Sequence, residues 1–164
     1  HYGEGVKKNH KKSFQHFKAD ALKKHPRSLF WMGEFYMDGL CTKKNPKEAT
    51  KYFKLAIKLG DPDAMCCLGV IYHNGYLGKP DFKKSVEYYR KSSKYDSRSM
   101  YNLGLCHLEG EGVRKSEKIA IRWFKKAAES GEEDAIIKLR QLNANSPARS
   151  GRKFERQYIK KLLW

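Results

Sequence analysis

Residues 99–131 contain two stretches in which apolar residues recur at helical spacing, with a glycine-rich segment between them. In the second stretch one stripe takes the positions i, i+3, i+4 and i+7, occupied by Ala120, Trp123, Phe124 and Ala127. The first stretch places Gly104 on its apolar side, where the missing side chain allows another helix to approach closely. We therefore predict a helical hairpin, whose first helix ends at Gly110 because glycine tolerates a left-handed backbone.

The same pattern recurs along the chain every 35 to 36 residues, as the alignment of Gly104, Gly69 and Gly33 shows. The second helix repeats its aromatic positions, and its start repeats a short polar residue able to cap a helix, namely Ser116, Asp81, Asn45 and Asn9. Two helices per unit of this length predict an all-α fold. We expect a right-handed α-solenoid of stacked helix-turn-helix hairpins, each burying its apolar face on its neighbours.

Period alone does not separate this solenoid from tetratricopeptide or pentatricopeptide repeats, which have about the same length. The sequence motif separates them, because it resembles that of the Sel1-like repeat family. The motif reads Leu-Gly-x-x-Tyr/His-x-x-Gly in the first helix, followed by Ala-x-x-Trp/Tyr-Phe/Tyr-x-x-Ala-Ala-x-x-Gly in the second. The residues that carry the resemblance are Leu68, Gly69, Tyr72 and Gly75 in one unit, and Leu103, Gly104, His107, Gly110, Ala120, Trp123, Phe124, Ala127, Ala128 and Gly131 in the next. Serines replace alanines at Ser85, Ser92 and Ser93, which indicates a divergent member.

We predict three regions along the chain. Residues 1–142 form the solenoid, with an incomplete first unit (1–27), full units at 28–61, 62–96 and 97–131, and a half unit at 132–142. Residues 143–151 are rich in small and helix-breaking residues and predict a linker. Residues 152–164 predict a basic amphipathic helix, which could cap the solenoid, bind an anionic surface or attach to a membrane. The sequence starts inside a repeat and without methionine, so we interpret it as a piece of a longer polypeptide.

The formal charge of +17 is the unusual feature of the composition. Residues 1–27 carry 8 basic and 2 acidic side chains, and residues 143–164 carry 6 and 1. Such charge attracts nucleic acid, anionic membrane or acidic protein through a salt-sensitive field, and it also fits plain solvation of lysine-rich helices. The candidate residues for an anionic partner are those of the basic ends: Lys7, Lys8, Lys11, Lys12, Arg149, Arg152, Lys153, Arg156, Lys160 and Lys161.

Few residues in the sequence suggest a catalytic, metal or disulfide site. The four cysteines occupy different repeat positions, which is typical of reduced thiols in the cytosol or a similar compartment, and we predict that Cys106 is buried. Cys66 and Cys67 are adjacent and lack a zinc-ligand spacing. His16 and His107 fall in aromatic positions of the repeat, which predicts packed imidazoles. With no nucleophile motif or phosphate loop in the sequence, we predict no catalysis, no metal, no cofactor and no small-molecule substrate.

The aromatic residues of the second helices alternate with lysines, a pattern that would also suit stacking on single-stranded nucleic acid. Because the same residues form the packing stripe, we assign Phe53, Tyr89 and Phe124 to the core.

The resemblance implies a scaffold function, because Sel1-like proteins serve as adaptors in endoplasmic-reticulum quality control, in control of chitin synthase and in signalling. Our first hypothesis is therefore an adaptor that binds protein partners and assembles a multiprotein complex. We expect its binding surface on the inner, concave face formed mostly by the first helices, at exposed positions outside the stripe: Glu34, Met37, Asp38, His73, Asn74, Asn102 and Glu109. Two alternatives stay open, a ribonucleoprotein subunit that holds RNA phosphates with its basic ends, and a regulator attached to a membrane by residues 152–164.

Overall fold

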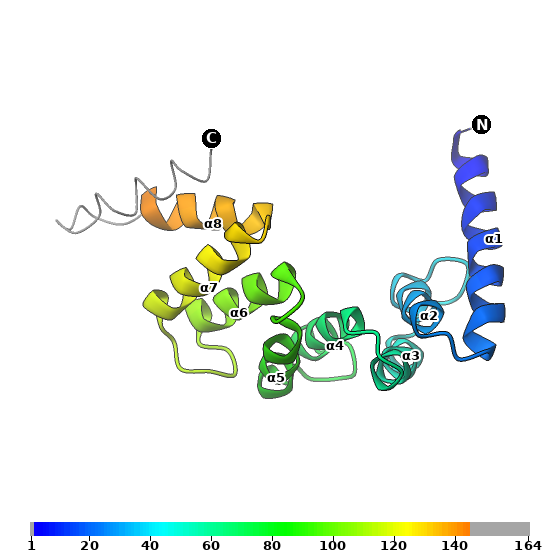
Figure 1. The fold of residues 1–164 in the computed structure, drawn as a ribbon, viewed down its shortest axis with the longest axis horizontal. Coiled ribbons are helices and arrows are strands. Elements are labelled where there is room, and N and C mark those ends of the chain that lie inside the picture. The colour runs from blue at the N-terminus through cyan, green and yellow to red at the C-terminus, as the bar shows by residue number, and fades with distance from the viewer. Residues whose placement is uncertain (1, 145–164) are drawn as a thin grey trace. The chain divides into compact units, whose positions relative to one another are not determined.

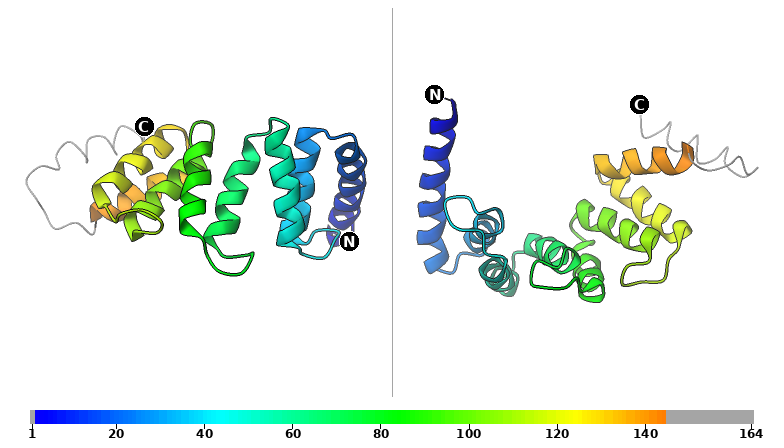
Figure 2. Two further views of the ribbon diagram at one scale, coloured as in Figure 1. Left: turned by 90° about the horizontal axis from the view of Figure 1, so that it is seen from below. Right: turned by 180° about the vertical axis from the view of Figure 1, so that it is seen from behind.

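A computed structural model describes residues 2–144, with side chains from residue 9 onward. The described chain is helical, and its elements are α1 Tyr2–Leu22, α2 Pro26–Asp38, α3 Pro46–Lys58, α4 Asp63–His73, α5 Phe82–Ser92, α6 Ser97–Glu109, α7 Glu117–Glu129 and α8 Glu133–Ala144 (Figure 1). Successive helices are joined by short turns into hairpins, as expected of an α-solenoid (Figure 2). The chain divides into two compact units between Tyr88 and Tyr89, within α5.

Short polar side chains start the second helix of each full hairpin, as the sequence predicts. The Asn45 side chain accepts a hydrogen bond from the Glu48 amide (3.2 Å), and the Ser116 hydroxyl accepts one from the Ile119 amide (3.3 Å). Asp81 accepts one from the Lys84 amide at 3.0 Å. Each bond satisfies one of the amides that the first turn of a helix leaves without an intrahelical partner. The predicted caps at these three positions are confirmed.

The cap predicted at Asn9 is wrong, because α1 runs without a break from Tyr2 through Asn9. In the full hairpins the amide of the cap residue donates to a carbonyl nine residues earlier; Asn45 bonds Tyr36 (2.8 Å), and Ser116 bonds His107 (2.7 Å). Inside the continuous helix α1, by contrast, the Asn9 amide belongs to the intrahelical hydrogen-bond pattern, so Asn9 does not begin a helix.

In the first unit α2 packs on both α1 and α3, and α3 packs on α4. The centre of this core is Phe53, which is wholly buried and reaches the backbone of α2 at Gly33. A Cβ atom at Gly33 would lie 2.4 Å from the Phe53 ring, so only glycine lets α2 and α3 approach this closely. The buried residues of this core are Leu29, Phe30, Ala49, Phe53, Ala56, Ala64, Leu68 and Ile71.

The second unit repeats the arrangement with α6, α7 and α8. Phe124 is wholly buried and packs on Gly104, where an added Cβ would again lie 2.4 Å from the ring. Gly110 ends α6 in the left-handed conformation, with φ of 83°. The predicted packing role of Gly104 and the turn at Gly110 are therefore confirmed. Around Phe124 the buried residues are Ala120, Ala127, Ala128, Ala135 and Leu139.

Two predictions about histidine have opposite outcomes. His107 is buried, and its Nδ1 lies 3.4 Å from the Arg114 carbonyl oxygen, as expected of a packed imidazole. His16 is exposed over 73% of its side chain and lies beside the Asp20 carboxylate, so its predicted packing is wrong. The cause is the neighbour: α1 packs through Phe14 and Phe17 on Phe35 of α2, and His16 lies outside that contact.

At the other end of the chain, α8 extends to Ala144, two residues into the segment predicted as a linker. The remainder of that segment and the predicted helix 152–164 lie outside the described residues.

Candidate protein-binding surface

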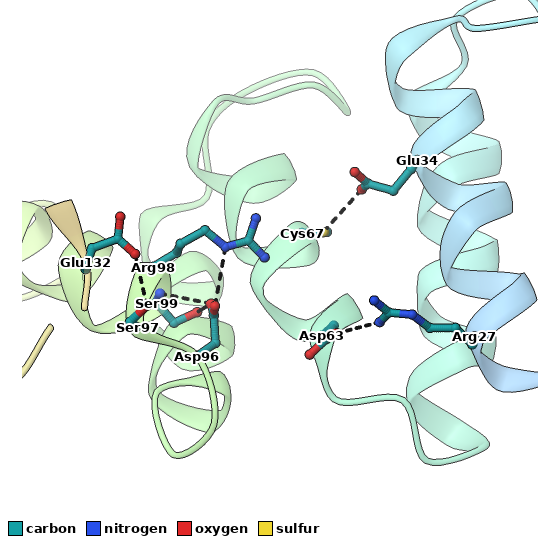
Figure 3. Close-up of polar contacts among 9 residues, drawn as sticks. All are labelled: Arg27, Glu34, Asp63, Cys67, Asp96, Ser97, Arg98, Ser99 and Glu132. Carbon is teal, nitrogen blue, oxygen red and sulfur yellow. Dashed lines mark hydrogen bonds and ion pairs between the residues drawn. The ribbon is translucent and has the colours of Figure 1, made fainter. Parts of the chain in front are cut away.

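Polar side chains join neighbouring hairpins of the first unit (Figure 3). Arg27, at the start of α2, forms ion pairs with Asp63, at the start of α4, and with Asp61 at 3.5 Å. The hydrogen bond to Asp63 is the main cause that raises the pKa of Arg27 above its ordinary value. The guanidinium also lies 4.6 Å from the centre of the Phe30 ring, a cation–π distance. Arg27 thus holds two successive first helices in register.

A second contact between these helices comes from Glu34, one of the residues predicted to bind a partner. Its carboxylate accepts a hydrogen bond from the Cys67 thiol of α4, with 3.4 Å between sulfur and oxygen (Figure 3). Glu34 is half-buried. The structure therefore gives Glu34 a role inside the solenoid, where substitution would disturb packing between repeats as well as any surface contact.

The second unit has its own polar junction, built on Asp96 (Figure 3). Asp96 caps α6 by accepting hydrogen bonds from the amide (3.0 Å) and hydroxyl (2.8 Å) of Ser99. Ser97 donates to Glu132, which precedes α8, at 3.0 Å. Asp96 takes the place of the repeat's closing glycine, and sequence reasoning missed its capping role, although an acidic residue three positions before Ser99 at a helix start is a recognisable signal.

The predicted partner-binding residues differ in exposure. Asp38, Asn74 and Glu109 are exposed, as expected. Met37 is half-buried and packs against the core of the first unit, and the His73 ring contacts the Phe82 ring edge-on at 5.4 Å. The expectation that all seven are exposed is wrong for the half-buried members, Glu34, Met37, His73 and Asn102. Glu34, Met37 and His73 contact neighbouring helices, because the first helix of a repeat packs on other helices on more than one side.

The three exposed residues occupy one position of the repeat, the residue immediately before the turn glycine. Asp38 precedes Gly39, Asn74 precedes Gly75, and Glu109 precedes Gly110. Asn74 also closes its helix, since its side-chain amide donates to the Val70 carbonyl at 3.0 Å. Each hairpin therefore presents a polar side chain at the C-terminal end of its first helix, where helix carbonyls are available to hydrogen-bond donors.

Aromatic side chains of the second helices pack inside the fold. Phe53, Tyr89 and Phe124 are buried as predicted. Tyr36 and Tyr52 stack with ring centres 5.5 Å apart, and burial raises the pKa of Tyr52. Tyr72 and Tyr88 repeat this stack at 5.6 Å. One face of each of these rings is therefore covered by its partner and is not open to a nucleobase.

The predicted basic ends can be followed only in part. Lys11 and Lys12 are exposed on α1. The others, Lys7, Lys8, Arg149, Arg152, Lys153, Arg156, Lys160 and Lys161, are not among the residues whose side chains the structure describes.

All four cysteines are thiols, because each lies in the described range and none forms a disulfide. Cys106 is buried as predicted, and burial raises its pKa to about 12. Within residues 9–144 no group of three or more His, Cys, Asp or Glu side chains could hold a metal ion. None of the helices in the described range has the length and apolar character needed to cross a membrane.

Comparison with known proteins agrees with this architecture. The family model described as "Sel1 repeat" matches residues 1–19, 26–61, 62–94 and 97–132. A Sel1 repeat protein from Oxalobacter formigenes superposes with a TM-score of 0.80 and 27% identity, over 93% of this chain and 62% of its own length. A search of the curated proteins finds no match.

Two further solved structures are similar. A protective antigen of uropathogenic Escherichia coli with an SLR fold has a TM-score of 0.68 and 30% identity, over 75% of this chain and 27% of its own. Helicobacter pylori cysteine rich protein B has a TM-score of 0.58 and 29% identity, over 79% of this chain and 94% of its own. The chain thus spans less than two thirds of the Oxalobacter and Escherichia proteins.

Proposed function

This chain belongs to the Sel1 repeat family, and from that premise we propose that it is a non-catalytic adaptor that binds protein partners and assembles a multiprotein complex. Sel1 repeats generally mediate protein–protein interaction, and stacked hairpins act by presenting an extended surface. The observation that carries the proposal is the recurrence of exposed polar residues at one repeat position, at Asp38, Asn74 and Glu109. In each unit, partner segments would form hydrogen bonds to these side chains. The half-buried Glu34, Met37, His73 and Asn102 would shape the surface around them.

The first test is affinity purification of the chain from its native extract, with and without nuclease, followed by mass spectrometry. Protein partners that survive nuclease support the adaptor function. A set of partners lost with RNA supports the ribonucleoprotein alternative, which the net charge of +17 motivates, and contradicts the adaptor. Binding to anionic vesicles that disappears on truncation after Gly151 would instead support membrane attachment.

The second test locates the surface. The variant D38A/N74A/E109A is expected to lose captured partners while its far-UV circular dichroism stays unchanged, because all three side chains are exposed. The matched control S13A/Q15A/Q141A changes three exposed polar residues elsewhere and should retain the partners. Equal retention by both variants would contradict this choice of residues while leaving the adaptor function itself to the nuclease experiment.

A further inference from the structure

Charge is divided unevenly between the two classes of helix. The first helices of the hairpins, α2, α4, α6 and α8, contain 4 basic and 6 acidic residues. The second helices, α3, α5 and α7, together with α1 at the equivalent repeat position, contain 17 basic and 6 acidic residues. The positive charge is therefore a property of one helix of every repeat as well as of the chain ends. Counting charged residues separately for the first and second helices would have revealed this uneven distribution from the sequence alone.

The clearest case is α3, where four lysines occupy the positions i, i+4, i+7 and i+11. These residues, Lys47, Lys51, Lys54 and Lys58, are all exposed and are called the lysine stripe below. At 1.5 Å per residue the stripe extends about 16 Å along one side of the helix. The opposite side of α3 carries the fully buried Phe53 and Ala56, so the helix cannot rotate without opening the core.

Most of this charge has no acidic partner among the side chains of residues 9–144. Lys51 pairs with Glu48. Among the residues that the structure describes, Lys47, Lys54 and Lys58 form no ion pair. Lys54 and Lys58 lie one turn apart, and like charges at this spacing repel one another mildly. A ligand with carboxylates at matching spacing would relieve that repulsion, which gives it a favourable electrostatic term.

Two leucines lie beside the stripe. Leu55 follows Lys54 and is 36% exposed, and Leu59 follows Lys58 and is 38% exposed. They are one helical turn apart, so they form a small apolar strip along the lysines. We propose that the lysine stripe, with Leu55 and Leu59, docks an acidic amphipathic segment of a partner protein. This inference rests on the proposed adaptor function and adds a second surface, on a second helix, to the one formed by first helices.

The chemistry of this surface favours an acidic protein segment over a nucleic acid. All four cations are lysines, which act as point charges and lack the planar fork with which arginine recognises phosphate. Of the neighbouring aromatic rings, Phe53 is buried and Tyr52 has one face covered by Tyr36, which leaves little surface for stacking a nucleobase. Exposed leucines contribute nothing to phosphate binding, but they match the apolar face of an amphipathic helix.

The same surface is unsuited to a membrane. A helix that lies on a bilayer inserts a wide apolar face, and that face of α3 is the one that already packs in the core. Only the outer parts of Leu55 and Leu59 remain available. An acidic segment needs no insertion, because its carboxylates meet the lysines at the protein surface while its apolar residues cover the two leucines.

The test uses the whole 164-residue chain and fluorescence polarisation. The probe is a labelled peptide of about 16 residues with glutamates at i, i+4, i+7 and i+11 and leucines at neighbouring helix positions, a length that covers the stripe. We expect it to bind more tightly than a scrambled peptide of the same composition, than oligouridine RNA, and than phosphatidylserine vesicles. Affinity should fall as salt rises from about 0.05 to 0.5 M, because exposed charges are screened.

The decisive variant is K47Q/K54Q/K58Q, compared with the control K23Q/K43Q/K79Q, which removes the same charge from exposed lysines outside the stripe. We expect the stripe variant to bind about tenfold more weakly and the control to stay within about threefold of the wild type, from typical energies of exposed ion pairs. The variant L55Q/L59Q should weaken binding at least about threefold while leaving the salt dependence unchanged. Circular dichroism confirms that each variant is folded.

Equal losses in the stripe and control variants would overturn the inference, as would tighter binding to the RNA or the vesicles. A charge swap supplies an independent readout. The variant K54E/K58E should lose the acidic peptide and gain a peptide in which lysines replace the two facing glutamates, and failure of that exchange also refutes the docking. If these tests fail while nuclease-resistant partners are still captured, the docking of an acidic segment on the lysine stripe is refuted and the adaptor function stands. If the nuclease-resistant partners are themselves absent, the adaptor function is refuted.

Discussion

Replacing Gly104 with alanine tests the contact that joins the two helices of the third full hairpin. The new Cβ would lie 2.4, 2.5 and 2.9 Å from three carbons of the Phe124 ring. Carbon atoms in contact normally lie about 3.5–4.0 Å apart, so the ring has to move by about 1 Å. The ring is wholly buried and also contacts Tyr101, with ring centres 5.6 Å apart, so it has no free space to enter.

Two opposing terms set the size of the effect. Forcing extra atoms into a packed core typically costs about 1–3 kcal/mol. Alanine gains about 1 kcal/mol over glycine inside a helix. We therefore expect G104A to lower the free energy of unfolding by about 1 kcal/mol. The equivalent variant G33A should behave alike, because its Cβ would lie 2.4, 2.6 and 2.8 Å from Phe53 ring carbons.

A double-mutant cycle separates the two terms. In the background F124L the ring is absent, so G104A should stabilise by up to about 1 kcal/mol, the helix term alone. Urea denaturation followed by far-UV circular dichroism measures all four proteins, with N102A as a control that changes helix propensity on α6 without meeting the ring. An increase in stability for G104A in both backgrounds would refute the close-packing argument.

Three further outcomes follow from caps and thiols. The hydrogen bond from the Lys84 amide is the main cause that lowers the pKa of Asp81. The charged carboxylate therefore contributes stability above about pH 4, and this stability is lost as the pH falls through the pKa of the folded state. D81N keeps a capping side chain without the charge, so its urea midpoint should approach that of the wild type on acidification from about pH 6 to pH 3. Equal gaps at both pH values would contradict this. Ellman's reagent should modify exposed Cys41 quickly at neutral pH and Cys106 only on unfolding, because Cys106 is buried with a pKa of about 12. S116A should lower the free energy of unfolding by about 1 kcal/mol in urea titration, and an unchanged midpoint would exclude the cap.

We could predict the helices, their apolar faces and their caps because these features depend on residues three or four positions apart. The repeat also shows each of these local patterns several times along the chain. Gly33 and Gly104 stand at the same repeat position, and both meet a buried phenylalanine. Asn45 and Ser116 likewise both cap second helices. The prediction failed at Asn9, where the same local signal lies inside the continuous helix α1.

The candidate surface was less predictable, because exposure depends on helices that are distant in sequence. Met37 and His73 sit outside the apolar stripe of their own helices but contact other elements, so both are half-buried. Arg27 is an ordinary basic residue in the sequence, yet its partners Asp61 and Asp63 lie 34 and 36 positions away and show it to be a link between repeats.

The sequence by itself determined the family, the all-helical repeat architecture and the residues of each core stripe, since periodicity and glycine spacing record local geometry. Only the tertiary structure decided which polar residues remain available to a partner. Glu34 joins Cys67 between repeats, whereas Asp38, one turn further along α2, stays exposed. The physical reason is that stacking of hairpins covers one side of each helix and leaves another side exposed. Which side is covered depends on the position of the neighbouring hairpin, and the sequence of the helix itself does not specify it.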